Sequence, residues 1–230
     1  MEKSEGNCYF CGKAFKPGAM RRHILESHGY GGDEPCRLFI AENMAAGHHY
    51  WMIGDAAPDK AMSTLDKFLR MAWLECCGHM SDFIDSDEKA VGKSRKIGGF
   101  GRGDRVFHLY DYGIPTGVRV TFLDEFSRPP QQAGVRLLAR NVPPALACAK
   151  CGGAAASVCA GCGGIGEGKI FCPACFKGHR CGQKHGLPVT NSPRCGVCGY
   201  TGEGDGFKLD PLRPRPMVCG RQPMVWTVRE

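Results

Sequence analysis

The chain has 230 residues, a formal net charge of +7 and 15 cysteines. This length exceeds one average domain without sufficing for two large ones, so we expect one modest core flanked by small modules. No apolar run approaches the roughly 18 residues that a membrane helix requires, and residues 1–6 are not followed by the apolar stretch of a secretory signal, so we expect a cytoplasmic protein without membrane contact.

The first 30 residues contain the ligand spacing of a small zinc-binding unit. A Cys-x-x-Cys pair is followed by two histidines, close to the pattern of a two-Cys, two-His zinc finger. Phe15 and Met20 take the positions of that unit's small apolar core. We therefore predict a ββα zinc finger over residues 1–30, with the cysteines on a hairpin and the histidines on a helix. Its predicted ligands are Cys8, Cys11, His23 and His28.

The predicted finger is basic where its helix begins. Lys16, Arg21 and Arg22 occupy the region from which such fingers contact DNA bases. A single finger covers only about three base pairs and binds DNA weakly, however, and many single fingers contact proteins instead. Nucleic-acid contact by these three residues is therefore one hypothesis, and protein contact is the alternative.

Residues 36–143 are predicted to form the globular core, after a linker over residues 29–35. Short apolar or alternating runs predict strands, and Pro143 and Pro144 end the segment. We expect an α+β fold, in which a small, mostly antiparallel sheet packs against one main helix. The predicted strands are residues 50–55, 106–111, 118–123 and 135–139.

The main helix is predicted from apolar residues that recur at helical spacing between residues 65 and 76, and it is expected to end at Gly78. Ser63 and Asp66 have the spacing of a capping pair at its start. Cys77 and His79 beside it suit a thiolate nucleophile, but no third group indicates that arrangement. We therefore interpret Cys76 as a small hydrophobic residue of the buried stripe.

Residues 89–105 are the most basic stretch of the core, with the single aromatic residue Phe100 among glycines. A flexible basic loop with a ring that stacks on bases suits single-stranded nucleic acid. A solvated loop between strands is the alternative. The predicted contact residues of this loop are Lys93, Arg95, Lys96 and Arg102.

Residues 144–200 contain four Cys-x-x-Cys pairs with glycines beside them, which suit tight turns. A tetrahedral zinc ion needs thiolate pairs held by such turns, and repeated pairs in a reducing compartment indicate metal sites, not a disulfide framework. Few large apolar residues lie here, so we expect this module to fold only when it is loaded with metal.

The spacing constrains the pairing of these ligands without settling it. By analogy with the interleaved cross-brace of B-box and MYND-like modules, the first and third pairs share one ion, and the second pair shares another with a later His and Cys. A sequential pairing within residues 148–162 stays open, as does ligation by His185, Cys195, Cys198 or Cys219. With the finger, we expect about three zinc ions. The two predicted sets are Cys148, Cys151, Cys172 and Cys175, and Cys159, Cys162, His179 and Cys181.

Four segments resemble one protein family in their amino-acid sequence. They are residues 68–83, which contain Trp-Leu-Glu-Cys-Cys-Gly-His-Met-Ser, the Tyr-Asp-Tyr-Gly turn at residues 110–113, residues 137–141 and residues 187–200. Together they resemble the Ri-plasmid open-reading-frame-three-like family of prokaryotes, with the predicted finger outside the resemblance. The resemblance implies an α+β core with a cysteine-rich zinc extension, favours Cys181 over His185 as a ligand, and points to plasmids or mobile elements.

The leading hypothesis is a non-enzymatic zinc-binding protein that binds nucleic acid or a nucleoprotein complex. Residues 144–200 carry six Lys or Arg against Glu167 alone, although zinc-bound thiolates offset part of this charge. A zinc-dependent protein-interaction adaptor is the alternative, since B-box and MYND-like modules commonly bind peptides or folded domains. A zinc hydrolase is the weakest hypothesis, because each predicted set already has four protein ligands. Residues 201–230 are expected to form an extended arm.

Overall fold

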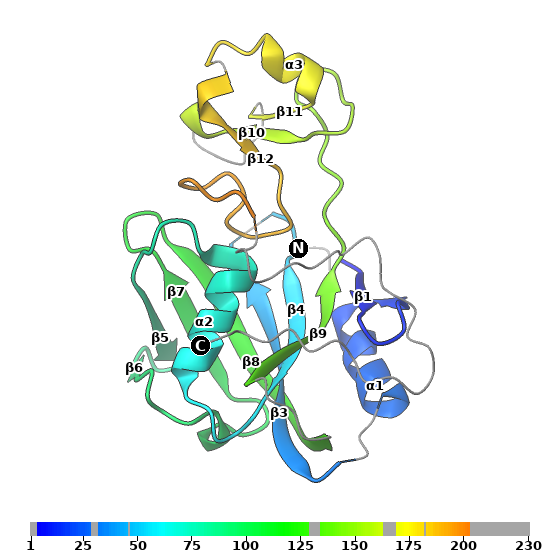
Figure 1. The fold of residues 1–230 in the computed structure, drawn as a ribbon, viewed down its shortest axis with the longest axis vertical. Coiled ribbons are helices and arrows are strands. Elements are labelled where there is room, and N and C mark those ends of the chain that lie inside the picture. The colour runs from blue at the N-terminus through cyan, green and yellow to red at the C-terminus, as the bar shows by residue number, and fades with distance from the viewer. Residues whose placement is uncertain are drawn as a thin grey trace.

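The computed structural model describes residues 4–28, 32–45, 47–128, 134–162, 169–181 and 183–202. A sheet with two helices forms the lower part in Figure 1, and a small cysteine-rich module lies above it, joined by two chain segments. The arm predicted over residues 201–230 lies almost wholly outside the described residues. Within those residues, no helix is long and apolar enough to cross a membrane.

The lower part is built on one sheet of nine strands in the order β2-β1-β9-β4-β3-β8-β7-β5-β6. Every described pairing is antiparallel, so that prediction is confirmed. The sheet is larger than expected, because β1, β2, β3, β5 and β6 join the four predicted strands. Strand β3 begins inside the predicted linker. The strands are β1 (Gly6–Cys8), β2 (Ala14–Phe15), β3 (Glu34–Asn43), β4 (Trp51–Ala56), β5 (Ser81–Asp85), β6 (Ala90–Val91), β7 (Arg105–Tyr110), β8 (Thr116–Arg128) and β9 (Val135–Asn141).

Helix α2 (Met62–Leu69) covers one face of this sheet. A π-helical turn (Arg70–Leu74) continues it, and the chain is extended from Glu75, so the helix ends before the predicted Gly78. The apolar stripe predicted from the sequence is buried against sheet residues such as Phe39. The buried stripe residues are Leu65, Phe68, Leu69, Ala72 and Trp73.

Backbone atoms cap the start of α2, so the predicted Ser63–Asp66 capping pair is wrong. The amides of Met62 and Ser63 donate to the carbonyl oxygens of Arg95 and Lys93 (2.9 Å each). No side-chain hydrogen bond caps this helix. Asp66 is buried instead, because its position in the helix directs it toward the sheet.

Helix α1 (Pro17–Ser27) covers the opposite face of the sheet (Figure 1). Strand β1 pairs with β9, and Met20 and Ile24 are buried against a sheet surface that includes Leu38 and Trp51. Along β3, Phe39 belongs to the α2 side and Leu38 to the α1 side, because successive side chains point to opposite faces. The N-terminal unit is therefore continuous with the sheet.

Residues 89–105 do not form the flexible loop considered above. They contain β6 and a short 3-10 turn (Ile97–Gly99). Phe100 is 4% exposed, and its ring stacks on that of Phe122 with centroids 4.9 Å apart. The guanidinium of Arg95 lies 4.1 Å from the Phe100 ring centroid on the solvent side of the core. Because burial of an aromatic ring is strongly favourable, Phe100 belongs to the core and is not available to stack on bases.

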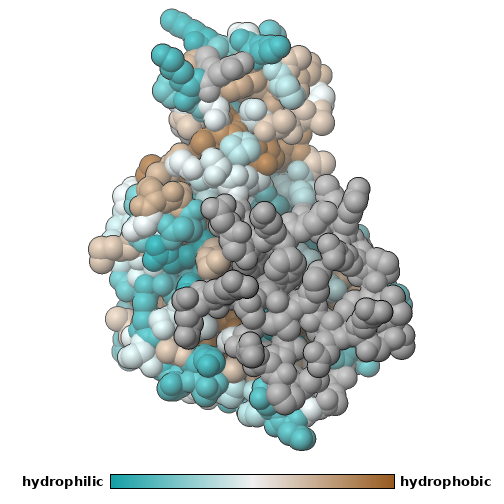
Figure 2. Space-filling model, viewed as in Figure 1, coloured by the Kyte–Doolittle hydropathy of each residue, from teal (hydrophilic) through white to brown (hydrophobic). Residues whose placement is uncertain are grey.

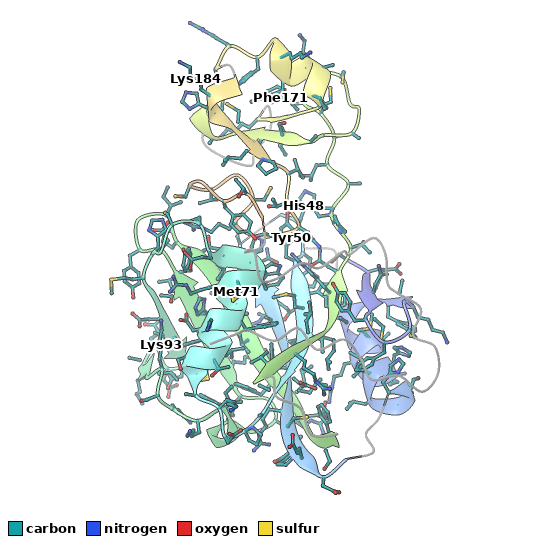
Figure 3. All side chains as sticks on the ribbon, viewed as in Figure 1. His48, Tyr50, Met71, Lys93, Phe171 and Lys184 are labelled. Carbon is teal, nitrogen blue, oxygen red and sulfur yellow. The ribbon has the colours of Figure 1, made fainter. Side chains whose placement is uncertain are left out.

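The cysteine-rich module has a small antiparallel sheet in the order β11-β10-β12. Its buried cluster has four members, and Figure 3 shows one of them, Phe171, inside the module. The elements are β10 (Ser157–Cys159), β11 (Ile170–Phe171), helix α3 (Pro173–Lys177) and β12 (Gly186–Pro188), with 3-10 turns at Ala160–Cys162 and Gln183–His185.

After β12 the chain returns to the sheet, in a stretch that we call the return segment (residues 189–202). The hydroxyl of Ser192 donates to the carbonyl oxygen of Trp73 (2.6 Å), and Arg194 and Tyr200 are buried. The spacing of the cysteines predicts one module over residues 144–200. In the structure, the return segment packs on the sheet-built part, because its polar side chains have buried partners there.

Candidate metal centres

Four groups of cysteine and histidine side chains are close enough to hold metal ions, and within each group all candidate ligand atoms lie within 4.8 Å of one another. Three of the groups coincide with sets predicted from the sequence. The fourth was not predicted. The groups are the finger group (Cys8, Cys11, His23, His28), the first module group (Cys148, Cys151, Cys172, Cys175), the second module group (Cys159, Cys162, His179, Cys181) and the helix-end group (Cys76, Cys77, His79, Cys198).

The finger group is assembled by the β1–β2 hairpin and α1. The amide of Gly12 donates to the carbonyl oxygen of Cys8 (2.7 Å), and Gly12 has φ +74°, so the cysteines sit on a tight turn. The Nε2 atoms of His23 and His28 lie 3.1 Å apart, and Cys11 Sγ lies 3.2 Å from His23 Nε2. Burial lowers the pKa of both histidines, which favours the neutral imidazole that binds metal.

The two module groups interleave along the chain. Cys151 Sγ lies 3.7 Å from Cys172 Sγ in the first module group. In the second, Cys162 Sγ lies 3.4 Å from His179 Nε2 and 3.5 Å from Cys181 Sγ. The first pair thus meets the third, as in the cross-brace arrangement. The sequential grouping that the sequence left open is not the one adopted.

These separations fit a tetrahedral ion. Zn–S bonds of about 2.3 Å and Zn–N bonds of about 2.0–2.1 Å place the ligand atoms of a tetrahedron about 3.3–3.8 Å apart. The five separations given above span 3.1 to 3.7 Å. The donor sets, two Cys with two His, four Cys, and three Cys with one His, are all sets that structural zinc uses. Zinc is therefore compatible with each group.

Ionisation of all four thiols of the first module group is unfavourable without a cation. The amide of Cys172 lowers the pKa of Cys148 to about 6, whereas hydrogen bonding with the Cys172 thiol raises the pKa of Cys175 to about 12. The first thiolate therefore opposes formation of the next. A divalent cation removes this opposition, because it stabilises every thiolate that it binds.

The helix-end group joins segments that are far apart in the sequence. Cys76, Cys77 and His79 follow the π-helical turn, and Cys198 comes from the return segment. From the sequence, Cys76 is predicted to be a core residue, and Cys198 has no defined partners. The sequence signals for this group are a Cys-Cys-x-His run and a Cys-x-x-Cys pair, and neither alone is a complete ligand set.

The other ligand candidates are placed elsewhere. His185 is exposed and belongs to none of the groups formed by the described residues. Cys195 is buried, and its Sγ accepts a hydrogen bond from the amide of Thr190 (3.2 Å). Cys36 is buried in β3. Cys219 lies outside the described residues.

The basic residues predicted to contact nucleic acid have different surroundings. Lys93, labelled in Figure 3, donates to Asp66 (3.0 Å) and Ser81 (2.9 Å), and His108 donates to the same carboxylate (2.7 Å). Burial raises the pKa of Asp66, but the hydrogen bonds from His108 and Ser81 outweigh it and hold that pKa well below its usual range. Lys93 therefore balances a buried carboxylate.

Two of the predicted arginines converge on β8. Arg21 donates twice to the carboxylate of Asp124 (2.7 and 2.9 Å), and Arg102 Nε lies 3.8 Å from the same carboxylate. The side chain of Arg102 is 73% exposed. Arg22 follows Arg21 in α1 and is exposed. The predicted contact residues Lys16, Arg95 and Lys96 are exposed as well.

Arg194 is not part of the basic surface counted from the sequence. Its side chain is 0% exposed, it forms an ion pair with Asp111, and it donates to Thr116 Oγ1 (3.0 Å). Figure 2 shows hydrophilic atoms at the tip of the cysteine-rich module and hydrophobic atoms where the module approaches the sheet. The exposed basic residues of the module are Lys150, Lys177, Arg180 and Lys184.

Comparisons with known proteins add little to this geometry. No family model and no curated protein matches the chain. The comparison with solved structures found a similarity to the protein of unknown function MM3350 from Methanosarcina mazei Go1, at 14% sequence identity and a TM-score of 0.41. The match covers 46% of this chain and 69% of that protein. The resemblance to the Ri-plasmid family stays a prediction.

Proposed function

We propose that this chain is a non-enzymatic, zinc-dependent protein that binds nucleic acid or a nucleoprotein complex. Zinc ions in the finger group and the two module groups hold its binding surfaces in shape. Each group offers four protein ligands, which leaves no open coordination position for a substrate. This supports structural zinc over a zinc hydrolase.

The observation that carries the nucleic-acid proposal is the meeting of α1 and β8 at Asp124. Arg21 and Arg102 share this one carboxylate, and exposed Arg22 follows Arg21 in α1. Because Arg22 and Arg102 are exposed, both guanidinium groups are accessible to a phosphate. We call this the junction surface (Arg21, Arg22 and Arg102). Exposed guanidinium groups attract phosphates and release their counterions.

Binding of labelled single-stranded and double-stranded DNA and RNA, measured by fluorescence anisotropy over a salt series, tests the proposal. We expect affinity to fall steeply with salt, since each neutralised phosphate contributes about 0.9 to the slope. The double variant Arg22→Glu, Arg102→Glu is expected to reduce that slope by about 2 and to weaken binding regardless of sequence.

The control is the double variant Lys67→Glu, Lys89→Glu, which makes the same charge change at two exposed side chains away from the junction surface, one in α2 and one in the turn between β5 and β6. The salt slope of this control should fall much less than that of the junction variant. An equal fall of the two slopes would mean that binding lies away from the junction surface. Absence of salt-sensitive binding to all four nucleic acids would contradict the proposed function.

A protein-interaction adaptor is the alternative that one observation favours. Met80, Leu109, Tyr112 and Ile114 expose large apolar side chains on and beside β5 and β7. Apolar groups that gather on a surface are typical of protein interfaces. Salt-tolerant binding of a protein, weakened by Met80→Ser with Ile114→Ser and unaffected by the junction variants, would support the adaptor instead.

We also propose membership of the Ri-plasmid open-reading-frame-three-like family. The proposal rests on the four segments quoted above and covers roughly residues 45–201. It implies association with plasmids or mobile elements and a cytoplasmic location. Sequencing the genomic surroundings of close homologues tests it, and consistent absence of mobile-element genes there would count against it.

A further inference from the structure

The helix-end group has the composition and spacing of a metal centre. Cys77 Sγ lies 3.0 Å from His79 Nε2, 3.7 Å from Cys198 Sγ and 3.8 Å from Cys76 Sγ. Cys198 Sγ lies 3.5 Å from His79 Nε2. Three thiols and one imidazole form a Cys₃His set, and these separations are close to the tetrahedral edges of about 3.3–3.8 Å that zinc bond lengths imply.

The backbone on both sides of the group is shaped to bring these atoms together. Gly78, between Cys77 and His79, has φ +79°, and its amide donates to a carboxylate oxygen of Glu75 (2.6 Å). Cys198 has φ +54°, which is uncommon for a residue with a Cβ atom. Such a conformation persists only where the surroundings over-determine it, and a shared ion provides that constraint.

Outer contacts orient the candidate ligands. The guanidinium of Arg194 donates to Cys76 Sγ (3.4 Å) and pairs with Asp111. The ring of His79 packs edge-on against Tyr110, with centroids 5.7 Å apart. A Cys₃His centre carries net negative charge, because three thiolates outweigh a divalent ion, and the nearby guanidinium offsets it.

Roles that need no metal suit only some members of the helix-end group. A small hydrophobic role suits Cys76, which packs against the core, but Cys77 and Cys198 are exposed. A disulfide between those two would need an S–S distance of about 2.05 Å, whereas their Sγ atoms lie 3.7 Å apart. His79 also lies 3.4 Å from the carboxylate of Asp111. Neither that ion pair nor a thiolate–imidazole pair, however, accounts for two exposed thiols within 3.5 Å of the same imidazole nitrogen.

We infer that Cys76, Cys77, His79 and Cys198 hold a fourth zinc ion, which fastens the return segment to the end of the α2 helix. The cysteine-rich module is joined to the sheet by two chain segments, and this ion holds one of them (Figure 1). Each of the other groups has a buried cysteine, whereas the helix-end group has none. The fourth ion is therefore the one that a chelator reaches first.

Metal counting by native mass spectrometry of the zinc-loaded full chain tests the site. We expect four zinc ions in the unaltered chain and three in both Cys77→Ser and Cys198→Ser. The control Cys195→Ala removes the other cysteine of the same Cys-x-x-Cys pair, and Cys36→Ala removes a buried cysteine of the sheet. Both controls should retain four ions.

Three outcomes would overturn the site: three ions in the unaltered chain, four ions in Cys198→Ser, or a Cys77–Cys198 disulfide in the purified protein. A variant that merely unfolds would lose more than one ion, which distinguishes it from loss of a single centre. Cobalt substitution checks the ligand set, since the difference spectrum between the unaltered chain and Cys198→Ser should be that of one tetrahedral thiolate site.

Hydrogen–deuterium exchange tests the fastening. In Cys77→Ser, we expect faster exchange in residues 189–202 and little change in residues 148–162 and 169–181, whose own ligands are intact. Unchanged exchange in the return segment of a three-ion variant would show that the ion does not fasten it. None of these readouts depends on nucleic-acid binding, so the inference and the proposed function fail independently.

Discussion

The sheet-built part and the cysteine-rich module differ in the side chains that they bury. The sheet buries aromatic and aliphatic side chains on both faces, under α2 on one side and α1 on the other. The described cluster of the module contains only Cys148, Cys159, Phe171 and Phe176 as buried members. Two of these four are candidate metal ligands.

This difference indicates which interaction stabilises each part. Burying a Phe side chain contributes about 1.5–3 kcal/mol, whereas ordering each backbone residue costs about 1–2 kcal/mol. These two phenylalanines and the buried Val158 cannot offset that cost over the length of the module. A structural zinc ion supplies about 10–16 kcal/mol of binding free energy in small zinc-binding peptides. We therefore expect metal to replace the core of the module but not that of the sheet.

The largest effect is expected from Cys172→Ser in the first module group. Loss of that ion should unfold most of the module and leave the sheet folded, because the sheet has its own apolar core. Limited proteolysis followed by mass spectrometry should find new cleavage after basic residues such as Lys150 and Lys177, with residues 47–128 still resistant. Resistance of the module equal to that of Cys36→Ala would show that metal does not build it.

Phe68→Ala should produce the converse effect. This residue is buried between α2 and the sheet, where its ring meets that of Phe39 edge-on at 6.1 Å. Removing it should lower the free energy of unfolding of the sheet by about 3–5 kcal/mol, through lost burial and the cavity that remains. Urea titration followed by tryptophan fluorescence measures this. Loss of the ions of both module groups in the same variant would mean that the two parts do not fold independently.

The finger group should depend on metal less than the module and more than the sheet, because α1 has both candidate ligands and apolar packing. His28→Ala removes one ligand, but Met20 and Ile24 remain buried against the sheet. We expect loss of one ion and a decrease in unfolding free energy of about 0.5–3 kcal/mol. Exchange of the α1 amides should rise without reaching that of an unfolded chain. Complete loss of protection in α1 would mean that the finger, like the module, needs metal to fold.

The buried Asp66 network should make the sheet, and not the module, depend on acid pH. Burial raises the pKa of Asp66, but hydrogen bonds from His108 and Ser81 outweigh it, so the folded pKa lies below the ordinary value. The contribution of ionised Asp66 to the free energy of unfolding is present above the unfolded pKa of about 3.9. It is lost as pH falls toward the folded pKa. The urea midpoint should fall over this range less in Asp66→Asn than in the unaltered chain; equal falls would contradict the assignment.

Ser63→Ala should have the smallest effect. The side chain of Ser63 is exposed and caps nothing, since the α2 amides are satisfied by the backbone of residues 93–95. A change in unfolding free energy within about 0.5 kcal/mol is expected, typical of a surface substitution. A loss of about 1 kcal/mol or more would mean that Ser63 acts as the cap that its spacing indicated.

Local patterns predicted the parts of this molecule that local interactions decide. The helical stripe from Leu65 to Trp73 is buried as the periodicity indicated, and the strand run at residues 50–55 lies within one residue of β4. The three predicted ligand sets come together, because each is built from closely spaced pairs.

Long-range contacts decide the features that the sequence did not reveal. Phe100 lies in a glycine-rich basic run that indicates an exposed loop. Its burial depends on stacking against Phe122 of β8, which is distant in the sequence. Cys198 sits in a Cys-x-x-Cys pair like the others, but its neighbours are Cys77 and His79 of the core. The sequence indicates that Arg194 is a surface charge, but in the structure its side chain is buried in an ion pair with Asp111.

Hydrogen–deuterium exchange of the full chain, zinc-loaded and after complete chelation, shows which part metal builds. We expect chelation to abolish protection in residues 148–162, 169–181 and 183–188, while β3, β4, β8 and α2 remain protected. Retained protection in the module without metal, or simultaneous loss in module and sheet, would contradict the claim that metal builds one part and apolar burial the other.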